Sequence, residues 1–180
     1  MSWMRILSPV ATVAEDSVAP SKADVTFVSS VTGKVWSLPF SDVNTAGDDD
    51  YVFYLTTTGD NAIEITDIRL SSTAATRVYV HSVEGTVSGG TSINPISRTI
   101  GSSATMDGMA EYGTDLTGLT SAGIAFFLEC PVANTLYHLK TSSGIRVPRG
   151  QAIALLVENG TADLTGVVSV VQHSISNGAF

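Results

Sequence analysis

The chain has little charge. Only 14% of its 180 residues are Asp, Glu, Lys or Arg, whereas an ordinary soluble domain carries about 25%. Serine and threonine take their place and make up roughly a quarter of the sequence, well above ordinary usage. Because surface charge keeps a monomer dispersed in water, we expect neighbouring subunits to cover much of this surface. The alternative is a monomer whose solubility depends on its Ser and Thr hydroxyl groups alone.

Clustered cations and long apolar runs are also missing. Nine Lys and Arg stand against 17 Asp and Glu, which gives a net charge of −8 and a pI of about 4.6. Phosphate backbones are bound by clusters of Lys and Arg, so no nucleic acid is expected as a partner. Although 43% of the residues are hydrophobic, no run approaches the roughly 18 apolar residues of a membrane helix. A membrane partner is therefore not expected either.

The sequence also lacks the residue patterns of common active sites. Cys130 is the single cysteine, which excludes an intrachain disulfide and a cysteine-based zinc site, and its place at the end of an apolar run predicts burial. The three histidines, His81, His138 and His173, are too far apart in sequence for a local metal pair. No Gly-x-Ser-x-Gly elbow and no P-loop lysine occur. We predict no enzymatic activity, no catalytic residue and no cofactor, unless the fold brings the histidines together.

One acidic loop is the remaining candidate for a metal. Asp48, Asp49 and Asp50 follow one another, with Asp42 shortly before them and Asp60 after the next expected strand. Several carboxylates in one loop can hold Ca²⁺ through their oxygen atoms, but the spacing of an EF-hand is absent. A solvated turn is the favoured interpretation, and no metal ligand is assigned.

What the chain does contain is a succession of short strand patterns. Tyr51–Thr58 is aromatic and β-branched. The apolar phase of Ile63 and Ile65 flips to that of Ile68, which predicts a bulge or bend near Asp67. About eight to ten strands with Gly-rich turns and no βα alternation predict an all-β protein, an antiparallel β-sandwich that is jelly-roll-like. The other expected strands are Arg77–Val83, Ser92–Ile100, Ile124–Cys130, Thr135–Lys140, Ile145–Val147, Gln151–Glu158 and Val167–His173.

The N-terminal part differs from the rest. Residues 1–34 mix small, polar and isolated apolar residues without a period, which predicts an extended N-terminal arm ahead of a sandwich domain at 35–180. Val25–Val28 is the one strand-like segment of this arm. The apolar stretch near the start of the arm, Ile6–Ala14, is too short for a secretion signal and is interrupted by Ser8 and Pro9. Synthesis in a cytoplasm is therefore expected. The arm residues assigned to partner binding are Trp3, Ile6, Leu7 and Val10.

Two segments resemble known proteins. Ser143–Gly160 leads through Arg149-Gly150 into an apolar strand and an Asn-Gly loop, and the β-branched Val167–Val171 follows. This pattern resembles the closing hairpin of jelly-roll virion proteins of tailed phages, and Gly85–Thr99 resembles their mid-domain loop and strand. The similarity covers roughly half of the chain and is one of pattern. It implies a capsid decoration (cement) protein, commonly a homotrimer on the capsid exterior, whose arm reaches across neighbouring capsomers.

Three hypotheses about function follow. The first is a virion protein made in the host cytoplasm that binds the major capsid protein and stabilises the capsid shell. The alternative is a receptor- or glycan-binding domain of a fibre, spike or baseplate, with an exposed aromatic such as Tyr112 or Tyr137 in a loop cluster. The third is a β-sandwich enzyme, which requires two histidines within reach of one another.

Overall fold

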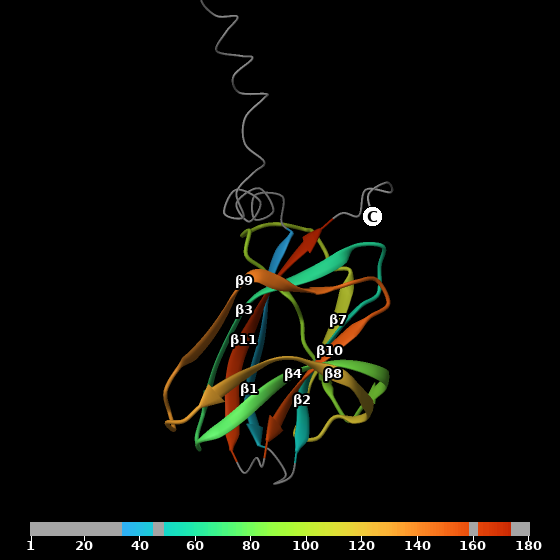
Figure 1. The fold of residues 1–180 in the computed structure, drawn as a ribbon. Helices are drawn as coiled ribbons and strands as arrows, with labels where there is room; N and C mark the ends of the chain where they lie inside the picture. The colour runs from blue at the N-terminus through green and yellow to red at the C-terminus, as the bar shows by residue number, and fades with distance from the viewer. Residues whose placement is uncertain (1–33, 45–48, 159–161, 174–180) are drawn as a thin grey trace, which may run out of the picture.

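The computed structural model describes residues 34–44, 49–158 and 162–173. Figure 1 shows strands arranged in two twisted sheets. No helix occurs in these ranges, so none there could span a membrane. The strands are β1 (Val35–Asn44), β2 (Asp50–Thr57), β3 (Ala62–Ser72), β4 (Thr76–Ser88), β5 (Thr91–Ser92), β6 (Ile96–Ser97), β7 (Gly108–Tyr112), β8 (Thr117–Cys130), β9 (Tyr137–Val147), β10 (Ala152–Glu158) and β11 (Asp163–His173).

The strand order of the two sheets is that of a jelly roll. One sheet runs β6-β1-β11-β3-β9 and the other runs β5-β7-β2-β10-β4-β8, and the strand pairs are antiparallel. The short strands β5, β6 and β7 lie between β4 and β8 in the chain. When the eight remaining strands are counted from 1 to 8 in chain order, strands 1, 8, 3 and 6 (β1, β11, β3 and β9) form one sheet. Strands 2, 7, 4 and 5 (β2, β10, β4 and β8) form the other. This is the double-sheet arrangement of two Greek keys, and the predicted fold class is confirmed.

Several details differ from the sequence prediction. β4 runs past the expected stop at Gly85, β8 begins well before Ile124, and β9 is one strand where the sequence predicts two. The expected closing hairpin is wrong as well, because β9 and β11 lie in one sheet and β10 lies in the other. A period-2 pattern shows which residues share a face of a strand, but it does not show which sheet the strand joins.

The core lies between the two sheets. Alternate side chains of the long strands point inward, and the rings of Phe40 on β1 and Phe53 on β2 meet across the sandwich with their centroids 5.6 Å apart. Burial of each large apolar side chain contributes roughly 1.5–3 kcal/mol. The bulge predicted near Asp67 is confirmed, since the register of β3 against β9 shifts between Ile65 and Asp67. The largest fully buried side chains include Trp36, Phe53, Leu38, Leu55, Ile63 and Ile65.

A second, smaller apolar cluster covers part of the outer face of the six-stranded sheet. Its members Tyr54, Val83 and Ala154 alternate along their strands with core residues, so they point away from the core. Leu116, from the loop between β7 and β8, covers them and is fully buried. Its backbone N–H donates to the carbonyl of Tyr51 at 2.8 Å, which holds the loop in place. The end of this face where β4 begins and β8 ends has no comparable cover among the described residues.

Candidate interaction surface

β8 is the edge strand of the six-stranded sheet. It pairs with β4 on one side, and no strand within the described ranges pairs with its other side. A strand of a sandwich ordinarily buries every second side chain, whereas every residue from Thr120 to Phe127 is exposed. Over this stretch the opposite sheet therefore does not cover the inner face of β8.

Large apolar side chains are concentrated on this strand and on the loop that follows it. They are Ile124 (60% exposed), Phe126 (41%), Phe127 (56%), Val132 (58%) and Leu136 (67%). The three on the strand, Ile124, Phe126 and Phe127, are named the β8 patch. From Thr117 to Leu128 the strand contains no charged residue. Because proteins usually protect edge strands with charges, prolines or covering loops, an apolar edge of this kind indicates an interaction surface.

Phe127 also ends a row of side chains that crosses the outer face of the sheet. Tyr51 of β2 pairs with Leu156 of β10, which in turn pairs with Tyr79 of β4. Tyr79 pairs with Phe127 of β8, and their ring centroids lie 6.2 Å apart, within the range of favourable aromatic pairs. The outer face therefore presents an apolar, partly aromatic strip that reaches the open edge.

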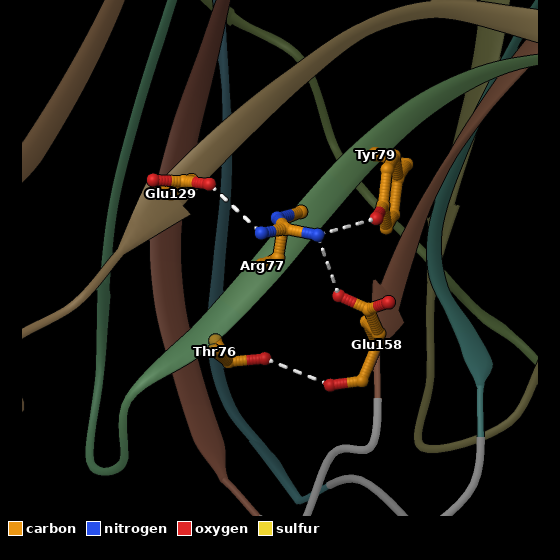
Figure 2. Close-up of polar contacts among 5 residues, drawn as sticks. All are labelled: Thr76, Arg77, Tyr79, Glu129 and Glu158. Carbon is orange, nitrogen blue, oxygen red and sulfur yellow. Dashed lines mark hydrogen bonds and ion pairs between the residues drawn. The ribbon is translucent and has the colours of Figure 1, made fainter.

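An ion-pair network borders this strip, as Figure 2 shows. Arg77 Nη2 lies 2.8 Å from Glu129 Oε1, and Arg77 Nη1 lies 3.3 Å from Glu158 Oε2. Nη1 also donates to the hydroxyl of Tyr79 at 3.1 Å, and the guanidinium carbon lies 5.8 Å from the ring centroid of Phe127. Hydrogen bonds to Tyr79 and Glu129 raise the pKa of Arg77 above its ordinary value. The cation thus stays charged and is held against both aromatic rings and both carboxylates.

A shallow hollow lies beside Arg77. The hydroxyl of Thr76 donates to the backbone carbonyl of Glu158 at 3.1 Å (Figure 2), and both residues line the hollow. Exposed ion pairs contribute little to stability, so the network matters more for the position of its charges than for stability. The hollow has a volume of about 340 Å³ and is lined by Ala75, Thr76, Arg77, Glu129, Pro131 and Glu158.

The histidines have separate partners. His138 pairs with Asp67, and His173 Nε2 lies 2.9 Å from Glu64 Oε2. His81 lies in the other sheet, on β4. Within the part of the chain that the structure describes, no three His, Cys, Asp or Glu side chains could hold a metal ion. The geometry that the enzyme hypothesis requires, two histidines within reach of one another, does not occur here.

His81 has a contact that the sequence does not reveal. Its Nδ1 lies 2.7 Å from Ser121 Oγ, which is 40 positions away in the sequence, and 3.4 Å from the hydroxyl of Tyr51. A serine beside a histidine is one part of a nucleophile–base pair. However, the buried Nε2 of His81 has no hydrogen-bond partner among the described residues, so no carboxylate orients the ring as acyl transfer requires. The contact therefore serves to tie the edge strand β8 to β4.

Other singled-out residues are placed as follows. Cys130 is completely buried, as predicted, and burial raises the pKa of its thiol to about 11. Tyr112 and Tyr137 are half-buried against the core on strands of different sheets, so they do not share a loop cluster. The hydroxyl of Tyr137 accepts from the N–H of Val132 at 2.8 Å and donates to its carbonyl at 3.1 Å, which occupies it with the backbone.

The acidic loop and the arm are only partly described. Asp49 is exposed, Asp50 is buried at the start of β2, and Asp60 forms an exposed ion pair with Arg149 at 2.8 Å. Asp48 and the side chain of Asp42 lie outside the described residues. The arm residues assigned to partner binding also lie outside them: Trp3, Ile6, Leu7 and Val10.

Comparisons with family models, with curated proteins and with solved structures found no match to this chain. The fold, the exposed β8 patch and the composition of the surface are the features that bear on its function.

Proposed function

We propose that this chain is a non-enzymatic virion structural protein of a tailed phage, and specifically a capsid decoration (cement) protein. In this proposal it associates with itself, as the homotrimer that the resemblance implies, and binds the major capsid protein on the outside of the shell. The observation that carries the proposal is the β8 patch, an uncharged apolar edge on a body that already has a closed core.

The fold supports this class without selecting it. Double-sheet jelly rolls occur in viral capsid proteins, in lectin domains and in cupins. A cupin binds its metal through clustered histidines, and the described histidines His138 and His173 instead pair with separate carboxylates. The remaining choice is between a protein that packs on other proteins and one that binds sugars.

The surface favours packing on other proteins. Large apolar side chains are exposed on β8 although the inter-sheet core is complete, and the chain has only 14% charged residues. Contiguous apolar surface on a soluble protein usually marks a protein interface. A decoration protein has two such interfaces, one with its own copies and one with the capsid. The β8 patch suits the first, and the apolar residues of the arm suit the second.

The arm residues provide the test. We expect that replacing Trp3, Ile6, Leu7 and Val10 together by Ser in the full chain weakens binding to undecorated capsids of the parent phage by tenfold or more, since burial of one such side chain contributes roughly 1.5–3 kcal/mol. Co-sedimentation with the capsids measures the binding, and light scattering measures the oligomer, which should not change. Ile100→Ser, a replacement at an exposed residue of the body, is the control. Equal capsid binding by the quadruple variant and the intact chain would contradict the proposal.

One observation favours a second candidate, the receptor- or glycan-binding domain of a fibre, spike or baseplate. The hollow beside Arg77 is lined by two carboxylates, and the ring centroids of Tyr79 and Phe127 lie 6.0 and 5.8 Å from the guanidinium carbon of Arg77. Sugars are bound by aromatic faces together with hydrogen-bonding groups. Specific signals on a glycan array, lost on substitution of Phe127, would favour this candidate.

A further inference from the structure

One edge of β8 has no pairing strand among the described residues, and its stretch from Thr117 to Leu128 contains no charged residue. An edge strand presents a row of backbone N–H and C=O groups that can pair with another strand. Along β8 both faces beside this edge are exposed from Thr120 to Phe127, so a second strand can approach from that side. Small residues flank the patch, and a side chain added at Gly123 would meet nothing within 4 Å. The surroundings of the strand are therefore open as well as apolar.

We propose that β8 pairs in antiparallel fashion with β8 of a second copy of this chain, around a two-fold axis at Phe127. This inference rests on the self-association in the proposed function and adds a two-fold contact through β8, separate from the three-fold contact of the proposed homotrimer. In this register Phe127 lies opposite Phe127 of the other copy, and Phe126 lies opposite Leu128. Cross-strand aromatic and aliphatic pairs of this kind stabilise antiparallel sheets. The contact merges the two six-stranded sheets into one.

The proposed axis lies within the regular part of β8. From Phe126 to Cys130 each residue of β8 pairs in sequence with β4, and the first irregularity falls between Phe126 and Ile124. Side chains in the regular part alternate strictly, so Phe127 of both copies lies on the outer face and Phe126 and Leu128 lie on the inner face. The bulge beyond Phe126 lies opposite Glu129 and Cys130 of the other copy in this register, so the regular paired stretch spans Phe126 to Leu128 of each copy.

The absence of charge at this edge permits a second copy as the occupant. The chain has a net charge of −8, so two copies repel one another unless they meet where acidic groups are absent or neutralised. The nearest carboxylate to the axis is Glu129, which is held by Arg77 at 2.8 Å. In this register the two Glu129 residues are four residues apart along the ladder, about 13 Å. If the chain also forms homotrimers, this two-fold contact links one trimer to another. If it does not, the contact produces dimers.

A cysteine on the axis tests the proposal directly. In the full chain, Phe127→Cys places two thiols on opposite residues, whose Cα atoms in an antiparallel pair lie about 4.5–5.5 Å apart, within reach of a disulfide. Mild oxidation should convert most of this variant to a covalent dimer. Ile124→Cys on the same strand is the matched control, because its two copies would lie about 20 Å apart and should not cross-link. Both variants also carry Cys130→Ala, because residue 130 of one copy lies opposite residue 124 of the other in this register.

The outcomes separate this inference from the proposed function. Cross-linking at position 127 and not at position 124 supports the pairing. A stable oligomer in which neither variant cross-links overturns the pairing and leaves self-association intact, and equal cross-linking of both variants overturns the register. A chain that stays monomeric at high concentration contradicts the self-association itself. If hydrogen exchange on that monomer shows protected β8 amides, the occupant is another segment of the same chain, and the pairing also fails.

A charged variant gives an independent measurement. Phe127→Lys should raise the dissociation constant of the paired copies by about tenfold or more, as replacement of a central aromatic anchor does. Ile100→Lys introduces the same charge at a fully exposed position outside β8 and should leave the constant unchanged. Analytical ultracentrifugation measures both, and circular dichroism confirms that each variant is folded. An unchanged constant for Phe127→Lys would overturn the proposal.

Discussion

At the scale of single residues, the surroundings of His81 on the outer face of the six-stranded sheet change the pKa of its imidazole. Its ring lies with its centroid 5.7 Å from that of Tyr51 and 6.0 Å from that of Tyr79, in both cases edge-on. Its neighbours in these contacts are aromatic rings and hydroxyl groups, with Ser121 at 2.7 Å. Burial lowers the pKa of His81 below its ordinary value, because the surroundings stabilise the charged imidazolium less than water does.

A lowered histidine pKa predicts a pH-dependent loss of stability. The unfolded chain takes up a proton at His81 near pH 6.5, whereas the folded chain resists it, so protonation favours unfolding. The contribution of neutral His81 to the free energy of unfolding is therefore complete above about pH 7. It decreases as the pH falls through 6.5 toward the pKa of His81 in the folded chain. Urea unfolding of the wild type and of His81→Gln from pH 8 to pH 5 measures the effect. The wild type should lose more free energy of unfolding on acidification than the variant, and parallel curves would contradict this.

At the scale of elements, the β4–β8 pair depends on two glycines that face one another. Gly85 has a φ of +109° and Gly118 a φ of +77°, a region that residues with a side chain rarely adopt. A Cβ atom on Gly85 would lie 2.2 Å from the carbonyl oxygen of Gly118, and one on Gly118 would lie 2.3 Å from that of Thr86. The two backbones approach so closely here that neither position has room for a side chain.

Gly85→Ala should therefore be destabilising beyond ordinary backbone strain. Gly101→Ala is a matched control, because Gly101 also has a positive φ, +82°, but a Cβ there would meet nothing within 4 Å. We expect a loss of about 1 kcal/mol for the control and a clearly larger loss for Gly85→Ala, because the backbone of β8 must move. Chemical denaturation of both variants at one protein concentration measures the difference. Equal losses would show that the close approach is not important for stability.

The elements also show what the sequence could and could not predict. The flip of apolar phase between Ile65 and Ile68 is local, and it correctly located the bulge of β3. The exposure of Ile124–Phe127 could not be predicted in the same way, because a continuous apolar run is typical of a strand buried on both faces. Only the sheet order places this run at an edge. The contact of His81 with Ser121 likewise depends on the register between β4 and β8, which no local pattern contains.

At the scale of the whole molecule, the closed inter-sheet core coexists with an apolar edge. Trp36, Phe53 and Leu55 are almost completely buried between the sheets, while Ile124 and Phe127 are more than half exposed. The core does not need these two side chains, and the proposed self-association would account for their exposure. The acidic net charge of −8 then acts against association at long range, while the uncharged edge of β8 acts in favour of it at contact.

This balance predicts how salt affects self-association. Raising the ionic strength from 10 mM to 150 mM shortens the screening length from about 30 Å to about 8 Å, which weakens repulsion between two copies of net charge −8. An apolar contact does not lose strength under the same change, so the dissociation constant should fall several-fold. Sedimentation equilibrium across this range measures it, with Phe127→Lys as the variant whose association is already weakened. Dissociation on addition of salt would instead indicate an interface held by ion pairs such as those of Arg77, and would contradict an apolar contact through β8.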